Sequence, residues 1–201
     1  MTFFFDSLWS AMVATSMWEW LAFVTGILYV ILAAMRHISC WPFALISSIL
    51  FVYLCFIGKL YLESILQLFY VAMAIVGWIS WNNSKGKGKT IHRWTTGQHL
   101  ANLIISGIVA FVVGWMFDSF TDQKAPYIDA LTTVFSLAAT FMVTRRVLEN
   151  WLYWIVIDIF SIYLYSGRGY ELLALQMLIF TVLALFGYLS WRKQLKLQQE
   201  L

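Results

Sequence analysis

Asp158 is the only acidic residue well inside a long uncharged run of the sequence, and it follows two tryptophans at helical spacing. At about 100° per residue, Trp151, Trp154, Asp158 and Ser161 lie within one stripe of a helix. Two indoles a turn apart, with a carboxylate one turn further, can hold a flat cation by stacking, cation–π attraction and charge. A carboxylate in such a run is costly unless it faces water or a partner, which favours a functional role. A buried carboxyl that ties helices together is the alternative.

Two other apolar runs carry polar side chains on one face. Gln67 has a donor and an acceptor suited to an amide or a ribose diol, although glutamine also joins helices to each other. Hydroxyls such as those of Thr132 and Thr133 often bond their own helix backbone instead of a ligand. We take as candidate binding residues the set Gln67, Tyr70, Thr132, Thr133, Asn150, Trp151, Trp154 and Asp158.

The sequence shows no pattern of a catalytic, metal or cofactor site. His37, His92 and His99 have no metal-ligand spacing, and no glycine-rich nucleotide loop is present. We therefore expect no cofactor, no bound metal and no direct use of ATP by this chain.

The composition places these residues in a membrane. Of 201 residues, 62% are hydrophobic and 11% are charged, with a mean hydropathy of +0.78. A soluble domain of this size has too little interior to bury so much apolar surface. This excludes a soluble enzyme, a nucleic-acid binder and a disordered chain. Cys40 and Cys55 belong to one apolar run, so no disulfide framework is indicated.

Seven apolar runs have the length of a membrane-spanning helix, which needs about 20 residues. They are 17–35, 40–57, 60–81, 100–117, 128–144, 150–166 and 172–191. The stretch 3–15 is a short interfacial helix or an extension of the first span. The loop 82–98 is basic and polar, and we expect it to be solvated.

Lysine and arginine are distributed unevenly between the two ends of these spans. The loops of one side hold Arg36, Lys85, Lys87, Lys89, Arg93, Arg145, Arg146, Arg192, Lys193 and Lys196, whereas the other side holds Lys59, Lys124 and Arg168. Because basic loops stay in the cytoplasm, the pattern predicts an outside N-terminus and a cytoplasmic C-terminus.

The chain repeats itself at an offset of 110 residues, where 11 of the 46 residues from 36 to 81 recur without a gap. The matches include Arg36 with Arg146 and Trp41 with Trp151. The segment 77–81 (GWISW) falls on 187–191 (GYLSW). One unpaired helix separates two units of three, so both units cross the membrane in the same direction. Parallel repeats of this kind occur in SWEET sugar carriers.

We therefore expect an all-α integral membrane protein with two parallel three-helix bundles joined by a linker helix. The expected parts are an N-terminal segment 1–16, a first repeat 17–81, a basic loop with the linker helix and an external loop 82–127, a second repeat 128–191 and a cytoplasmic tail 192–201.

The sequence also resembles a known family. The pattern LY-x4-LQ-x2-Y-x6-GW-x2-W over 60–81 and the run ENW-x2-W-x3-D over 149–158 resemble PnuC-type vitamin transporters, and the resemblance covers about residues 18–191. The resemblance implies a SWEET-like fold and import of nicotinamide riboside by facilitated diffusion. It also implies a bacterial inner membrane, metabolic trapping by phosphorylation and assembly as a homotrimer. The resemblance also implies that Asn takes the position of Asp158 in some relatives.

Several functions remain open at this point. Thiamine and riboflavin carriers share the same architecture, and a SWEET-like sugar carrier would need more hydrogen-bonding groups than these stripes supply. A membrane enzyme would need a cluster of His or carboxylates at one interface, which the sequence lacks. A structural subunit would have no use for a polar stripe around Asp158. The expected partners are a small vitamin and membrane lipid, without nucleic acid.

Overall fold

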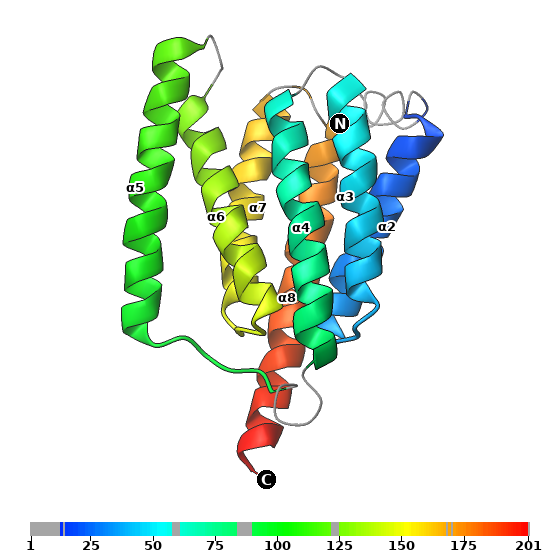
Figure 1. Ribbon diagram of the computed structural model, residues 1–201, viewed down its shortest axis with the longest axis vertical. Coiled ribbons are helices and arrows are strands. Elements are labelled where there is room, and N and C mark those ends of the chain that lie inside the picture. The colour runs from blue at the N-terminus through cyan, green and yellow to red at the C-terminus, as the bar shows by residue number, and fades with distance from the viewer. Residues whose placement is uncertain are drawn as a thin grey trace, which may run out of the picture.

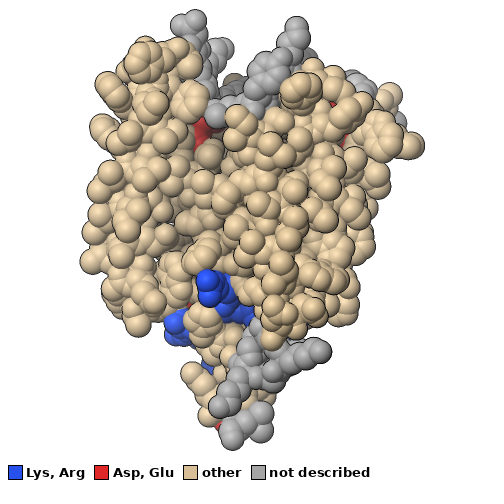
Figure 2. All heavy atoms as spheres, viewed as in Figure 1, with Lys and Arg blue, Asp and Glu red and all other residues tan. Residues whose placement is uncertain are grey.

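The computed structural model describes residues 13, 15–57, 61–83, 90–121, 125–167, 169 and 171–200. Seven helices occupy them: α2 (Met17–Ala34), α3 (Cys40–Ile57), α4 (Tyr61–Asn83), α5 (Thr96–Phe120), α6 (Pro126–Thr144), α7 (Asn150–Gly167) and α8 (Glu171–Gln199). They run alternately up and down, and the helix ends that carry Arg36, Arg145 and Arg192 lie at the end of the bundle where α8 leaves it (Figure 1). Figure 2 shows Lys and Arg gathered at this same end of the molecule, which we call the basic end.

Six of these helices are long and apolar enough to cross a membrane, and α7 falls short of the same hydropathy. Its sequence explains the difference, because α7 carries Asn150 and Asp158 on the face that it buries. It nevertheless packs between α6 and α8 as a full member of the bundle. The predicted all-helical membrane fold is confirmed, and of the seven described helices it is α7, the one outside the six candidate spans, that carries Asp158.

Two helices are longer than their apolar runs predict. A capping box between Thr95 and Gln98 starts α5 at Thr96, one turn before the predicted span. At the other end, α8 continues through residues 192–199, which include good helix formers and no Gly or Pro, so most of the predicted tail is helical. The predicted N-terminal segment 1–16 lies mostly outside the described residues. Its last residue, Ser16, is described and caps the N-terminus of α2.

The helices form two bundles of three joined by α5. The first bundle is α2–α3–α4, and the second is α6–α7–α8. They meet where α2 packs against α8 and α4 against α6, whereas α5, among the described helices, packs only against α6. In Figure 1, α5 stands at the edge of the bundle. The expected three-plus-one-plus-three arrangement is therefore present.

Hydrogen bonds between the bundles obey the repeat. Ser80 Oγ of α4 donates to the Thr144 carbonyl of α6, and Ser190 Oγ of α8 donates to the Ala34 carbonyl of α2, each at 3.1 Å. The turns that follow α2 and α6 also match, because Arg36 and Arg146 have φ values of 59° and 56°. Non-glycine residues rarely adopt this left-handed conformation, so its recurrence at the matching position shows that the duplication preserved the backbone conformation of the turn.

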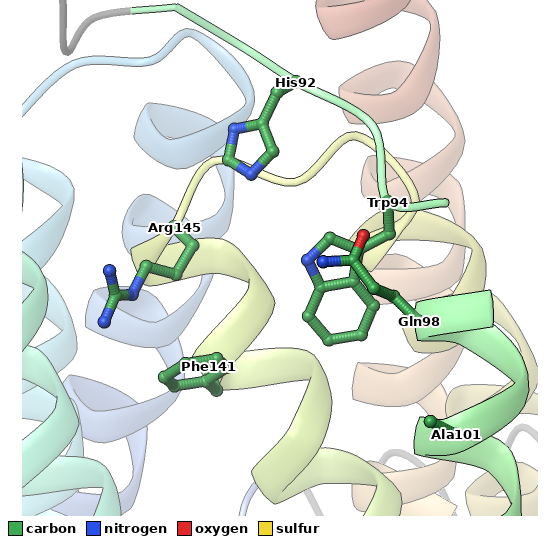
Figure 3. Close-up of a pocket in the computed structure, with 6 residues that line it drawn as sticks. All are labelled: His92, Trp94, Gln98, Ala101, Phe141 and Arg145. Carbon is green, nitrogen blue, oxygen red and sulfur yellow. The ribbon is translucent and has the colours of Figure 1, made fainter. Parts of the chain in front are cut away.

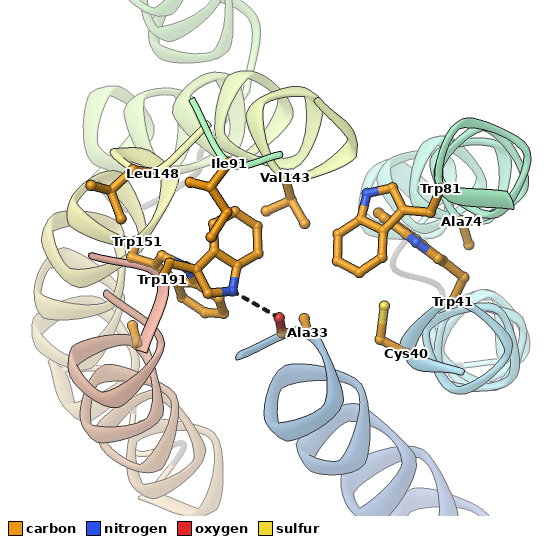
Figure 4. Packing of buried hydrophobic residues seen from close by; sticks show 11 residues of the cluster. Ala33, Cys40, Trp41, Ala74, Trp81, Ile91, Val143, Leu148, Trp151 and Trp191 are labelled. Carbon is orange, nitrogen blue, oxygen red and sulfur yellow. Dashed lines mark hydrogen bonds between the residues drawn. The ribbon is translucent and has the colours of Figure 1, made fainter. Parts of the chain in front are cut away.

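Four tryptophans at repeated positions fill the space between the bundles at the basic end (Figure 4). Trp41 meets Trp81 edge to face with centroids 5.3 Å apart, and Trp151 meets Trp191 in the same way at 5.4 Å. Trp81 and Trp191, 6.3 Å apart, join the two pairs. We call Trp41, Trp81, Trp151 and Trp191 the tryptophan quartet. It closes the interface between the repeats at this end.

The quartet is symmetric, but its surroundings differ between the repeats. The guanidinium of Arg146 lies 4.6 Å from the Trp81 ring centroid and donates to the Trp81 carbonyl at 3.4 Å. Its repeat partner Arg36 is exposed instead. Burial lowers the pKa of Arg146. Arg146 therefore supports the packing of the quartet, a role that its place in a basic loop did not predict.

Candidate functional site

The inner face of α7 carries the polar residues of the predicted stripe. Asn150, Trp151, Asp158 and Ser161 are buried, and Trp154 and Tyr165 are half-buried. The opposite face consists of exposed apolar or aromatic residues, namely Leu152, Val156, Ile159, Phe160 and Tyr163. The helical periodicity therefore predicted the inward face of α7 correctly.

Asp158 lies near the middle of α7 and is only 2% exposed. Its Oδ2 atom has no hydrogen-bond partner among the described residues. A buried carboxylate without a compensating charge or hydrogen bond is expensive, so this position favours a ligand that brings a positive charge or a donor.

Tyr70 brings the first repeat to Asp158. Its hydroxyl lies near the Ser136 side chain of α6 and within electrostatic range of Asp158 and Tyr165 of α7. Tyr29 of α2 interacts with Tyr70 in turn. Polar side chains from both repeats thus meet in the middle of the bundle, which is where a carrier with a site between its repeats needs them.

Toward the basic end of α7, two further polar atoms are buried without a partner among the described residues. Asn150 is fully buried, and its Nδ2 donates to the Val147 carbonyl at 2.6 Å, while its Oδ1 has no partner. The indole N–H of Trp151 also lacks one. Since more than about 90% of buried polar groups in native proteins are hydrogen-bonded, such atoms on one helix face indicate a polar ligand or water.

Trp151 and Trp154 have different surroundings. Trp151 is 3% exposed and belongs to the tryptophan quartet. Its ring packs against Gly187 and Trp191 and is therefore part of the hydrophobic core. Trp154 is half-buried and borders the same cluster. Trp154 is thus the more accessible of the two rings.

The remaining candidate residues lie toward the opposite end of the bundle, because α4 and α6 run antiparallel to α7. Thr132 is buried, but its hydroxyl donates to the Ile128 and Asp129 carbonyls of its own helix, as the alternative for these threonines anticipates. Thr133 and Gln67 are half-buried. Tyr70 thus lies near Asp158 in the middle of the bundle. Asn150, Trp151 and Trp154 lie between Asp158 and the basic end. Gln67, Thr132 and Thr133 lie toward the opposite end.

One polar residue of the interface was not among the candidates. Gln176 of α8 is buried, and its Nε2 lies 3.7 Å from where a β-carbon on Gly26 would be. Ser47 borders the same point at 3.2 Å. Gln176 is the one amide inside the seventh apolar run, and this was the signal that could have identified it.

The repeat shows that the site is chemically asymmetric. At the offset of 110 residues, Asp158, Tyr70 and Ser136 correspond to Ser48, Phe180 and Gly26. The second position of each pair is smaller or less polar. One half of the interface therefore holds Asp158, Tyr70 and Ser136, whereas the other half holds Ser48, Phe180 and Gly26 at the matching positions, with Gln176 and Ser47 beside Gly26.

Among the described residues, no group of three or more His, Cys, Asp and Glu is arranged to hold a metal ion. Within the described residues, Cys40 and Cys55 form no disulfide.

Comparisons with known proteins bear on this geometry. The family model described as "nicotinamide mononucleotide transporter" matches residues 16–193. The nicotinamide riboside transporter PnuC of Escherichia coli is 27% identical over 195 residues, covering 84% of this chain and 82% of that protein. The PnuC of Neisseria mucosa is 29% identical, covering 89% and 74%.

A riboflavin/roseoflavin transporter, RibM of Streptomyces davaonensis, is 25% identical over 92% of this chain and 84% of its own length. The crystal structure of the vitamin B3 transporter PnuC superposes with a TM-score of 0.77 at 27% identity, covering 97% of this chain and 89% of that one. The family match covers nearly the whole chain, including both bundles and α5. The chain is thus a multi-pass membrane transporter, not an enzyme, and it belongs to the nicotinamide mononucleotide transporter family.

Proposed function

We propose that this protein imports nicotinamide riboside, which binds between the two repeats along the inner face of α7. The observation that carries the proposal is the buried Asp158, whose Oδ2 atom is unpaired within the described structure and which lies close to Tyr70. Nicotinamide riboside combines a cationic pyridinium, a carboxamide and a ribose. The cation would balance Asp158, and this resolves the cost of burying that carboxylate.

The other candidate residues suit the rest of this molecule. Trp154, with Trp151 behind it, supplies an aromatic face, worth about 0.5–2 kcal/mol for a cation–π contact. Asn150 has an acceptor oxygen without a partner among the described residues, suited to the carboxamide N–H or to a ribose hydroxyl. Gln67, Thr132 and Thr133 would border the path of the substrate between Tyr70 and the end of the bundle opposite the basic end.

Transport by facilitated diffusion is part of the proposal. Asp158 is the one evident residue for coupling to an ion, and here it is assigned to the substrate. Accumulation would then come from phosphorylation of the riboside inside the cell, because the product carries charge that an acidic, aromatic site rejects. The N-terminus would lie outside and the C-terminus in the cytoplasm of a bacterial inner membrane. Assembly as a homotrimer, which light scattering of the purified protein measures, completes the proposal.

A second candidate cargo is riboflavin, which RibM is named for, and thiamine is a third. Riboflavin is a larger neutral ring system, whose imide N–H and ribityl hydroxyls can donate to a carboxylate but bring no positive charge to balance it. Thiamine carries a positive charge but no ribose. The Asp158 position therefore favours a cation over riboflavin, and the amides favour the riboside over thiamine.

Uptake into proteoliposomes tests cargo and energetics together. We expect saturable uptake of labelled nicotinamide riboside that stops at equal concentrations inside and outside. Uptake of thiamine or riboflavin in preference to the riboside would contradict the assigned cargo. Accumulation above equilibrium under an imposed proton or sodium gradient would contradict facilitated diffusion.

A further inference from the structure

A groove lies at the basic end of the bundle, apart from the inner face of α7. It has a volume of about 470 Å³ and is lined by His92, Trp94, Gln98, Ala101, Phe141 and Arg145. Figure 3 shows His92 and Arg145 on one side, Trp94 and Gln98 on the other, and Phe141 below them. Small-molecule sites commonly have volumes of about 300–1,000 Å³, so the groove has room for a ligand of nucleotide size.

The segment that forms one wall of the groove is fixed to the second repeat. His92 N donates to the Arg146 carbonyl at 3.2 Å, and Leu148 N donates to the His92 carbonyl at 2.9 Å. These bonds form an isolated parallel bridge between His92 and Val147. The wall is therefore set in place before any ligand arrives.

Glu149, the first residue of the ENW motif, holds the same segment. Its Oε1 accepts from Arg93 Nε at 2.7 Å, and its Oε2 accepts from Trp94 N at 3.3 Å. This pairing raises the pKa of Arg93. Because Arg93 balances the charge of Glu149, the nearby groove keeps the positive charge of Arg145.

Arg145 is an exposed residue that lines the groove. Its guanidinium lies 5.3 Å from the Phe141 ring centroid, and no salt bridge to Arg145 occurs within the described part of the chain. Its planar fork of N–H groups matches the oxygens of a phosphate, and the exposed ring of His92 is close by. Trp94 and Phe141 add aromatic surface on which a flat ring can stack.

We propose that this groove is a second ligand site, which binds a nucleoside phosphate with its phosphate on Arg145 and His92 and its ring against Trp94 and Phe141. The phosphorylated form of the proposed cargo belongs to this class of compound. The inference rests on the proposed function only for the identity of that nucleotide and for the side of the membrane. The aromatic rings favour a nucleotide over a lipid headgroup, which shares the phosphate but has no flat ring.

A second basic groove offers a matched control. It has a volume of about 330 Å³ and is lined by Leu189, Arg192, Lys193 and Lys196 on α8. It has cationic side chains but no aromatic ring. Arg192→Gln therefore removes the same charge from the same end of the molecule without touching the proposed site.

The test is calorimetric titration of nicotinamide mononucleotide into the purified full-length protein in detergent, with inorganic phosphate as a second probe. We expect Arg145→Gln to weaken binding of the mononucleotide roughly ten- to hundredfold, since a charge-assisted hydrogen bond is lost. We expect Arg192→Gln to leave it unchanged and phosphate alone to bind more weakly than the mononucleotide. Size-exclusion profiles report folding, and Arg145→Lys, which keeps the charge, should retain part of the affinity if Arg145→Gln fails to fold.

Several outcomes would overturn the site. Equal losses in Arg145→Gln and Arg192→Gln would mean unspecific attraction to positive charge. Competition between mononucleotide and riboside, with both weakened by Trp154→Ala, would place the nucleotide between the repeats. In nanodiscs with and without phosphatidylglycerol, displacement of the mononucleotide by the anionic lipid would identify a headgroup as the occupant. Riboside uptake that fails while Arg145-dependent nucleotide binding persists would refute the proposed function and leave this site standing.

Discussion

The close approach of Gly187 to Trp151 yields a sharp prediction about the tryptophan quartet. A β-carbon added at Gly187 would lie 2.6 Å from Cε2 and 2.7 Å from Cδ2 of the Trp151 indole. Ordinary carbon contacts are about 3.5–4.0 Å, so the substitution Gly187→Ala forces the ring or the helix to move. The ring has little freedom to do so, because Trp151 is 3% exposed and packs edge to face on Trp191.

The expected cost follows from two opposing terms. Overpacking of a well-filled core costs about 1–3 kcal/mol. Alanine recovers about 0.4–1 kcal/mol, because it restricts the unfolded chain more than glycine does. We therefore expect Gly187→Ala to lower the free energy of unfolding by up to about 2.6 kcal/mol, and by about 1–3 kcal/mol relative to a Gly→Ala change without the steric overlap. The affinity for the riboside should fall as well, because the displaced ring belongs to the proposed site.

The melting temperature of the purified protein, monitored by the loss of the folded peak in size-exclusion chromatography after heating, measures this effect. Gly107→Ala in α5 is the matched control, since a β-carbon there meets nothing within 4 Å. We expect the control to be neutral or slightly stabilising. A melting temperature for Gly187→Ala equal to or above that of Gly107→Ala would refute the packing described for the quartet.

Three further predictions concern the interface and the loops. Ser80→Ala removes the part-buried hydrogen bond to the Thr144 carbonyl and should cost about 0.5–1.5 kcal/mol by thermal unfolding; an unchanged melting temperature would argue against this link between the repeats. Glu149→Gln should speed hydrogen exchange at residues 90–95, since it removes the charge that holds Arg93; exchange like that of the parent would contradict the anchoring role. Arg36→Gln should leave the riboside affinity within about twofold, because Arg36 is exposed at the basic end. Arg146→Gln should destabilise the protein by about 1–3 kcal/mol, because it leaves Trp81 without its buried partner. Equal effects of the two substitutions on stability would contradict this asymmetry.

Helical periodicity and the internal repeat predicted most of what positions the site. Residues at the spacing of Trp151, Asp158 and Ser161 face inward because a helix in lipid buries its polar face against its neighbours. The offset of 110 residues identified Gly77 and Gly187, and both receive a tryptophan of their own repeat. These are local properties of a helix or consequences of duplication, so the sequence alone carries them.

Contacts between distant segments could not be predicted in the same way. Nothing near His92 indicates that it bridges to Val147, because this pairing depends on how the segment before α5 lies against the turn between α6 and α7. Arg146 looks like any other basic loop residue until the fold places it over Trp81. Gln176 stands out in the sequence as the one amide of its apolar run, but its place beside Gly26 and Ser47 depends on the packing of α8 against α2.

The central claim is that Asp158 receives the positive charge of the substrate, and one titration tests it directly. Nicotinamide riboside and its reduced dihydro form have nearly the same shape, but only the oxidised form is a cation. The protein should bind the oxidised form more tightly by roughly tenfold or more, because opposite charges attract strongly in a site shielded from water, and Asp158→Asn should abolish this preference while still folding. Equal affinity for both forms, or a preference that survives in Asp158→Asn, would contradict the account.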